Sequence, residues 1–369
     1  MAWLRISGVI AFGIAAGLTV TACGSGPGSA APASAAGSKP LSLTTVTVAG
    51  YEGSVNWASL WAAQAEGFYA KQGLTVKFVN TTASAASMVA ATIGDSYQFI
   101  AADPVGLPAA VQNGAQIRAV LTPDVGPTDD LVVSAKAAAE HHLPASGTLA
   151  QLRALKGSHL TIGVVSLTAG SYLDLLAVFK AQGLTAGTGS GSDIKVVSVG
   201  SLNDEADGLA SGHLDGFVNM YPNTEVPDAV HVMFGGVAPV SMEPPLAFTT
   251  SESMIESHPD TVQAFVTATV EGWEYTRQHP SQTKQIDSRV FPTVGVTDAA
   301  KIGELYQLDQ QHRGSTPAIT GAEYQAIQDV LQAAGTPTTV SYGGFVDSSF
   351  VNQAITQLKL GLPTGSAAG

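Results

Sequence analysis

The sequence predicts an α/β protein in which two βαβαβ units lie in one chain. EGFYAKQGLT (66–75) and FKAQGLTAG (179–187) both read as a helix that ends at a glycine and leads into a strand. In each, a lysine stands in the last turn, where the helix dipole favours a cation, and Gly73 or Gly183 follows in the left-handed cap position. The ends of the units match too, since IGDSYQFIAADP and SGHLDGFVNMYP both run from a glycine through a strand to a proline.

Each unit follows the same order of elements. In the first we expect strands at 45–50, 74–79 and 97–103, with helices at 55–71 and 84–93. In the second we expect strands at 160–165, 194–199 and 214–220, with helices at 172–181 and 203–210. Continuous apolar strands that alternate with helices imply mostly parallel sheets covered on both faces. Ligands bind beyond the carboxyl ends of such strands, so two facing lobes would hold a site in the cleft between them.

Composition and charge narrow the class of protein. The chain has 369 residues, of which 45% are hydrophobic and 12% charged, enough for two lobes with cores of their own. The net charge of −13 argues against nucleic-acid binding, which needs a basic surface. It also argues against adhesion to an anionic bilayer through a basic patch.

The N-terminus carries the pattern of an exported lipoprotein. Arg5 precedes the apolar run ISGVIAFGIAAGLTV, which is too short for a convincing membrane span. The run ends in VTAC, which resembles the bacterial lipobox, so we expect residues 1–22 to be a signal peptide and Cys23 to be lipidated. The following Gly/Ser/Ala/Pro segment, within a tether at 23–43, would span on the order of 25 Å as a flexible chain. The alternative is a plain secretory peptide with an incidental cysteine.

Motifs for catalysis and metal binding are absent from the sequence. It contains no G-x-S-x-G, no G-x-G-x-x-G, no P-loop and no H-E-x-x-H. The adjacent pair His141 and His142 reads as a solvated loop, and His159, His213 and His231 are isolated. We therefore expect no catalytic residues, no metal site and no cofactor.

Several segments together resemble a known family. WASLWAAQAEGFYAKQGLTVKFV is similar to the first helix and second strand of bacterial ABC-importer solute receptors, in the nitrate/sulfonate/taurine and thiamine-pyrimidine branch of periplasmic binding proteins. Further matching segments follow in that family's order: AATIGDSYQFIAADP, LVVSAK, LRALKGSHLTIGVVSLTAGSYL, LASGHLDGFVNMYP and HPDTVQAFVTATVEGWEYTRQHP. A fungal pyrimidine synthase on the same fold carries a Cys-rich motif, which this chain lacks.

The resemblance implies a type II periplasmic-binding-protein fold with a hinge of two chain crossings. We expect residues 44–130 with 239–360 to form one lobe, 131–238 the other, and 361–369 a disordered tail. The implied role is capture of a small organic nutrient by a monomeric receptor, anchored by lipid at the outer face of a Gram-positive cell membrane and served by an ABC permease and ATPase. The alternative is a lipid-anchored sensor or enzyme on the same fold.

The candidate binding residues lie in the loops that follow the strands. The first lobe and the return to it offer Tyr51, Asn56, Trp57, Ser84, Ser87, Asp103 and Glu243. The second lobe offers Ser166, Thr168, Ser171, Tyr172, Asn219 and Tyr221. Trp57 either stacks on a ligand or belongs to the core, Ser84 either caps a helix or also meets an anion, and Glu243 is either a ligand contact or a solvated hinge residue.

Two ligand chemistries remain open. The candidate loops contain no Lys or Arg, only the carboxylates Glu52, Asp103, Asp204, Glu205 and Glu243. An anion such as nitrate or a sulfonate would depend on helix N-termini and hydroxyl groups. An amine or neutral heterocycle would pair with a carboxylate and stack on Trp57, Tyr172 or Tyr221. The lack of cationic side chains favours the second.

Overall fold

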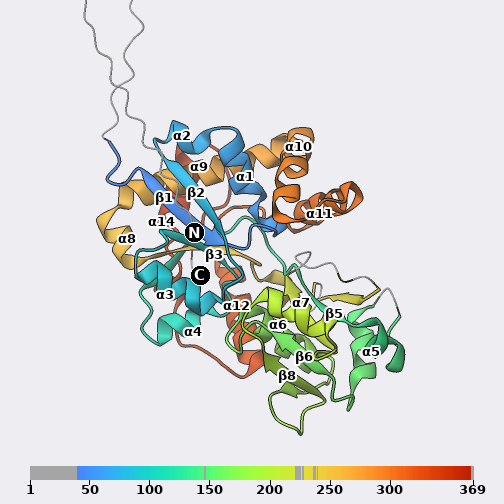
Figure 1. The fold of residues 1–369 in the computed structure, drawn as a ribbon. Coiled ribbons are helices and arrows are strands. Elements are labelled where there is room, and N and C mark those ends of the chain that lie inside the picture. The colour runs from blue at the N-terminus through green and yellow to red at the C-terminus, as the bar shows by residue number, and fades with distance from the viewer. Residues whose placement is uncertain are drawn as a thin grey trace, which may run out of the picture. The chain divides into compact units, whose positions relative to one another are not determined.

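The two predicted units fold into two sheets of the same topology. The computed structural model describes residues 40–144, 147–220, 226, 228–235, 238 and 240–366 (Figure 1). The first sheet has the order β2-β1-β3-β11-β4. Its strands are β1 (Thr45–Gly50), β2 (Thr75–Asn80), β3 (Phe99–Ala102), β4 (Ile117–Leu121) and β11 (Ala247–Ser251).

The second sheet has the order β10-β5-β9-β6-β8-β7. Its strands are β5 (Asp129–Val133), β6 (Thr161–Val164), β7 (Ala186–Gly187), β8 (Ile194–Ser198), β9 (Gly216–Met220) and β10 (Val230–Met233). The central strands β1 and β6 each run parallel to both neighbours, and β11 and β5 each run antiparallel to both neighbours. The run β8-β6-β9-β5-β10 therefore repeats β2-β1-β3-β11-β4, and the predicted α/β fold of two lobes is confirmed.

The two glycine caps that first suggested a repeat are built alike. Gly73 and Gly183 have φ of 80° and 75°, in the left-handed region that costs glycine little. In both copies the next residue closes the helix, because Leu74 N–H donates to Tyr69 O and Leu184 N–H donates to Phe179 O, each at 2.9 Å. These bonds are the six-to-one contacts of a Schellman cap, which turns the chain directly into the strand.

The helices cover both sheets. Those of the first unit are η1 (Val55–Trp57), α1 (Ala58–Ala65), α2 (Phe68–Lys71), α3 (Ala85–Ile93) and α4 (Leu107–Gln112). Those of the second are α5 (Ala135–Glu140), η2 (Leu149–Leu155), α6 (Gly170–Ala181) and α7 (Leu202–Ala210). The single helix predicted at 55–71 is divided, because Gly67 takes a φ of 72° and α2 starts anew after it.

The C-terminal part of the chain is helical. It contains η3 (Val240–Met242), α8 (Glu252–Ser257), α9 (Pro259–Gln278), α10 (Pro280–Val290), η4 (Phe291–Val294), α11 (Ala299–His312), α12 (Gly321–Ala334), α13 (Tyr342–Phe345) and α14 (Ser349–Gln357). Helix α9 packs against α1, α2 and α14, and its Phe265 stacks on Phe99 of β3 with ring centroids 3.9 Å apart. None of the helices in the described residues is long and apolar enough to span a bilayer.

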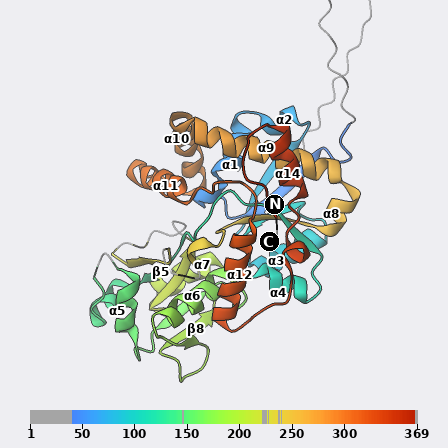
Figure 2. The same cartoon turned by 180° about the vertical axis from the view of Figure 1, so that it is seen from behind.

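Helix α12 corrects the predicted division of the chain. It lies beside α6 of the second lobe in both views (Figures 1 and 2), and Lys180 Nζ of α6 donates to Ala333 O at 3.1 Å. Ile327 and Leu331 share a buried cluster with residues of α6. The segment 239–360 therefore does not belong wholly to the first lobe, and the hinge has more than two crossings.

We define lobe 1 by the first sheet and lobe 2 by the second sheet together with α12. The predicted change of lobe after residue 130 comes slightly too late, because Asp129 already pairs within the second sheet. The first crossing, residues 122–128, is hydrogen-bonded to two of the other connections between the lobes, the return near Glu243 and the segment that leads from His312 to α12. Val125 N–H donates to His312 O and Gly126 N–H donates to Glu243 O, both at 2.7 Å.

The prediction of a disordered tail is wrong for residues 361–366. Gly365 N–H donates to Asn352 Oδ1 at 2.7 Å, and Asn352 Nδ2 donates back to Gly365 O at 2.9 Å. Leu362 packs against the core of lobe 1, and Thr316 Oγ1 donates to Pro363 O at 2.6 Å. These contacts fix the segment on α14, so the described part of the tail belongs to the fold.

Candidate functional site

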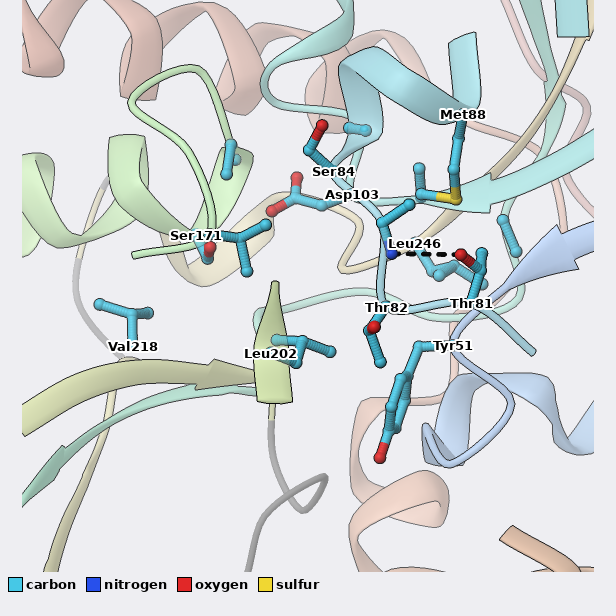
Figure 3. A pocket seen from close by; sticks show the side chains of 17 residues that line it. Tyr51, Thr81, Thr82, Ser84, Met88, Asp103, Ser171, Leu202, Val218 and Leu246 are labelled. Atoms are coloured by element: carbon cyan, nitrogen blue, oxygen red, sulfur yellow. Dashed lines mark hydrogen bonds between the residues drawn. The ribbon is translucent and has the colours of Figure 1, made fainter. Parts of the chain in front are cut away.

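A pocket with an empty volume of about 700 Å³, part of it open to solvent, lies between the lobes. Lobe 1 contributes the loops after β1, β2 and β3, and lobe 2 contributes the end of β6, the starts of α6 and α7, and β9 (Figure 3). The lining residues are Tyr51, Thr81, Thr82, Ala83, Ser84, Ala85, Met88, Ala101, Ala102, Asp103, Val165, Ala169, Gly170, Ser171, Leu202, Val218 and Leu246. The pocket thus sits at the carboxyl ends of the parallel strands, as expected.

The lobe 1 wall is formed by the turn that begins α3. Ser84 is the N-cap of this helix: its Oγ accepts from Ser87 N–H at 3.3 Å. Ser84 therefore caps the helix, and it also lines the pocket, while contact with an anion stays a prediction. Ser87 is exposed and does not line the pocket, but its hydroxyl lies 3.1 Å from that of Ser84.

Asp103 reaches from lobe 1 to the first residue of α6 in lobe 2. Its Oδ1 accepts from Val105 N–H at 2.8 Å, which turns the carboxylate toward α6. A Cβ placed on Gly170 would lie only 2.0–2.2 Å from the three carboxylate atoms, so only glycine leaves room for them. In Figure 3 the carboxylate lies between Ser84 and Ser171. The N-terminus of α6 carries partial positive charge, which favours an anionic group there.

The lobes also approach each other closely at Gly106, next to the contact between Asp103 and Gly170. A Cβ on Gly106, just before α4, would lie 2.5 Å from Thr168 O, just before α6. Because these two glycines have no side chains, the backbones of the two lobes can approach each other at Gly106, and the Asp103 carboxylate can approach the backbone at Gly170. Larger residues at either position would hold the lobes apart.

Behind Asp103 lies a cluster of buried carboxyl groups. Carboxylate oxygens of Asp103, Asp129 and Asp174 lie within 4.8 Å of one another. Asp174, in the second turn of α6, hydrogen-bonds to Glu243, which lies where the chain returns to lobe 1. We call these four residues the acidic cluster. Its oxygens lie close enough together to share one positive charge.

Burial shifts the titration of this cluster. Loss of water raises the pKa of Asp103 to about 7. It raises the pKa values of Asp129, Asp174 and Glu243 well above their usual range, and repulsion between the carboxylates raises them further. The cluster therefore binds protons at pH values where isolated carboxyl groups are ionised.

The sequence did not reveal all members of the cluster. The sequence predicts a change of lobe after residue 130, but it marks neither Asp129 nor Asp174 as a site residue. A carboxylate among the leucines of GSYLDLLAVFKA is a local signal, since a charge on the apolar face of a helix needs a reason. Glu243 is 1% exposed, so the interpretation as a solvated hinge residue is wrong.

Of the aromatic and amide residues of lobe 1 that the sequence predicts to bind the ligand, one lines the pocket and two are buried away from it. Tyr51 lines the pocket, and partial burial raises the pKa of its hydroxyl. Trp57 is fully buried and meets Phe78 edge to face at 5.5 Å, so it belongs to the core and does not line the pocket. Asn56 is buried beside Ser54, whose Oγ donates to Asn56 Oδ1 at 3.2 Å, and does not line the pocket either.

In lobe 2 the structure brings one predicted residue into the pocket, Ser171. Ser166 and Thr168 bind each other through their hydroxyl groups at 3.2 Å and lie outside the lining. Tyr172 is partly buried against the core next to the pocket, and Asn219 is fully buried in β9 opposite Asp130. Tyr221 lies outside the described residues.

The chemistry of the lining is apolar with neutral hydroxyl groups and one carboxylate. In the described part of the chain, no Lys, Arg or His lines the pocket. An anion about 4 Å from an ionised Asp103 would be repelled by roughly 4 kcal/mol at the effective dielectric constant of about 20 that suits such sites. The pocket therefore offers attraction to neutral or positively charged groups and none to an anion beyond helix N-termini and hydroxyls.

Solved structures with the same fold include several binding proteins. The nitrate-binding protein NrtA of Synechocystis PCC 6803 superposes with a TM-score of 0.69 at 14% identity, over 90% of this chain and 94% of that one. The alkanesulfonate-binding protein SsuA of Xanthomonas axonopodis pv. citri gives 0.59 at 16%, over 80% and 94%. CA3427 of Candida albicans, described as having the generic periplasmic binding protein fold, gives 0.61 at 16%, over 83% and 96%.

These likenesses establish the fold, the type II periplasmic-binding-protein arrangement of two α/β lobes that the sequence led us to expect. No curated protein matches the sequence significantly. A family model described as "NMT1/THI5 like" matches residues 54–283, which include every lining residue of the pocket except Tyr51. The chain therefore belongs to the NMT1/THI5-like family.

Proposed function

We propose that this protein is an extracytoplasmic solute receptor that captures a small organic molecule between its lobes and delivers it to an ABC importer. The observation that carries the proposal is the pocket, whose walls come from matching loops of the two repeated units. A site divided between two lobes is closed by hinge motion, one of the standard ways a protein surrounds a ligand. The absence of catalytic motifs favours binding over an enzymatic role on the same fold.

Closure is supported by the interlobe contacts at two glycines. Gly106 and Gly170 bring backbone and carboxylate closer than any side chain would permit. We expect the radius of gyration to fall when a solute saturates the pocket. Small-angle scattering of the purified protein with and without the tightest compound from a thermal-shift screen measures this change. An unchanged radius at saturation would contradict closure.

Delivery to an importer has its own test. We expect the loaded receptor to stimulate ATP hydrolysis by a permease–ATPase complex from the same cell, reconstituted in liposomes, while the receptor without solute stimulates it weakly. If the protein binds its solute but stimulates no importer, the result favours the alternative role of a sensor.

The proposed membrane anchor is the lipid on Cys23. This residue and the tether lie outside the described residues, so the proposal rests on the VTAC motif and the preceding apolar run. In Cys23→Ala we expect the protein to leave the membrane fraction, because its lipid attachment is lost. Membrane fractionation with mass spectrometry of the N-terminus tests this, and a variant that stays on the membrane with only the substitution's mass change refutes it.

A further inference from the structure

We propose that the solute is an organic cation, with a positively charged head that binds beside Asp103 and an apolar body that fills the rest of the pocket. The inference rests on the proposed function, that the pocket captures a solute. It goes further by naming the charge and the shape of that solute.

The first argument is the unbalanced charge of the site. Among the described residues of the lining Asp103 alone is charged, and three further carboxyl groups stand behind it. Asp129 Oδ2, Asp174 Oδ1 and Glu243 Oε2 are buried without a hydrogen-bond partner, in residues that are 4%, 2% and 1% exposed. Buried carboxyl oxygens without partners are costly, and a positive charge nearby relieves that cost.

The second argument is the direction of these groups. Oxygens of Asp129 and Asp174 approach the carboxylate of Asp103 to within 4.8 Å, so they converge on the place where Asp103 faces the pocket. They come from β5 and α6, and Glu243 comes from the return to lobe 1. Elements from both lobes therefore direct carboxyl oxygens to one end of the pocket.

The third argument is the apolar remainder of the lining. Met88, Leu202, Val218 and Leu246 surround the space on the other sides (Figure 3). An inorganic ion would gain nothing from these side chains, whereas an organic body would bury their surface and its own. The hydroxyls of Thr81, Thr82 and Ser84 offer neutral hydrogen bonds in between.

A cation should displace protons from the acidic cluster. The titratable groups around the site are the four members of the cluster, Tyr51 of the lining, Glu205 of α7, and Asp130 with its neighbours His231 and Lys301 on the other face of the sheet. Burial raises the pKa of Asp103 to about 7, and the pKa values of the other cluster members and of Glu205 lie well above the usual range. A cation binds the ionised form, so its affinity should rise with pH from 6 to 8. An anion would show the opposite dependence.

The experiment compares head groups on one body. Benzylamine, benzyl alcohol and phenylmethanesulfonate share an apolar ring, as do hexylamine, hexanol and hexanesulfonate. Each is titrated calorimetrically into the purified protein at pH 6 and 8, in two buffers of different ionisation enthalpy, which gives the number and sign of protons exchanged. Mn²⁺ alone is also titrated, to test whether the site binds an inorganic ion.

We expect the amines to bind tightest, with protons released and tighter binding at pH 8. Asp103→Asn should weaken amine binding about ten- to a hundredfold, as for loss of a charge-assisted hydrogen bond, and leave benzyl alcohol nearly unchanged. Asp207→Asn, at an exposed position of α7, is the matched control and should bind like the wild type. Glu243→Gln is a second test should Asp103→Asn fold poorly, and should also weaken the amines.

The other outcomes overturn the inference in distinguishable ways. Tighter binding of the sulfonates, with proton uptake, refutes the cationic solute but leaves solute capture standing. Binding of Mn²⁺ without any amine shows an inorganic ion site instead. No binding of either amine at pH 6 or pH 8 contradicts the inference, whereas solute capture itself is tested separately by the thermal-shift screen and by scattering.

Discussion

The unliganded protein should lose stability as the pH rises from 5 to 7, and Asp103→Asn should remove part of that loss. Asp103 has an ordinary pKa of 3.8, and burial raises it to about 7 in the folded protein. Between these values the folded state retains a proton that the unfolded state has released. This retained proton stabilises the folded state. Its contribution is fully present below the pKa that Asp103 has in the unfolded chain, and it is lost as the pH rises through the pKa of Asp103 in the folded protein.

The magnitude follows from the proton count. One retained proton changes the free energy of unfolding by about 1.4 kcal/mol per pH unit, so Asp103 accounts for roughly 2.5 kcal/mol between pH 5 and pH 7. Asp129, Asp174 and Glu243 add to the slope in the same direction, because their pKa values are raised as well. The difference between wild type and variant separates the share of Asp103 from theirs.

Urea unfolding at half-unit steps of pH, on protein dialysed free of solute, measures this dependence. In Asp103→Asn the free energy of unfolding should fall less steeply with pH, by the slope that corresponds to about one proton. Asp207→Asn, which alters an exposed carboxylate, should leave the slope unchanged. A stability that rises with pH over this range would refute the reasoning. Parallel curves for Asp103→Asn and wild type would refute the assignment to Asp103.

Two further predictions concern closure and a buried ion pair that Arg313 forms with Asp309. Gly170→Ala should weaken binding of the tightest screened compound about five- to a hundredfold without lowering the melting temperature, because its Cβ overlaps the Asp103 carboxylate only when the lobes meet. Gly303→Ala, where a Cβ meets nothing within 4 Å, is the control, and equal affinities would contradict the prediction. Arg313→Met should cost about 3–5 kcal/mol in urea unfolding, because it leaves the buried carboxylate of Asp309 without its positively charged partner. Adding Asp309→Leu should recover most of this loss, and a single variant that costs under about 1 kcal/mol would contradict it.

The strands, their parallel pairing and the repeat could be predicted because their signals are local. Apolar runs mark the strands, and Gly73 and Gly183 mark the helix ends through their left-handed conformation. The position of Trp57 could not be predicted, because an aromatic residue at a helix start suits either a core or a ligand. Packing against Phe78, together with Gly50, whose lack of a side chain leaves room for the indole, places it in the core.

The acidic cluster could be predicted only in part, for a different reason. Asp103 and Glu243 followed from their loops, but Asp129 and Asp174 come from a strand start and a helix interior. Their meeting depends on the order of strands in the sheets and on the contact between lobes, which no short stretch of sequence encodes. Helix α12 escaped prediction similarly, since Lys180 of α6 and Ala333 of α12, which are hydrogen-bonded, lie 153 residues apart along the chain.

The attachment of α12 to lobe 2 has a mechanical consequence. The chain passes between the lobes at 122–128 and 243–246, and again on either side of α12. Two connections would leave a lobe free to swivel as well as to bend, but additional connections at separate points remove that torsional freedom. Opening is then restricted to a swing about one axis, so the two halves of the pocket part and meet again in the same register. An importer that docks on both lobes could therefore distinguish the open from the closed receptor by the distance between the lobes alone.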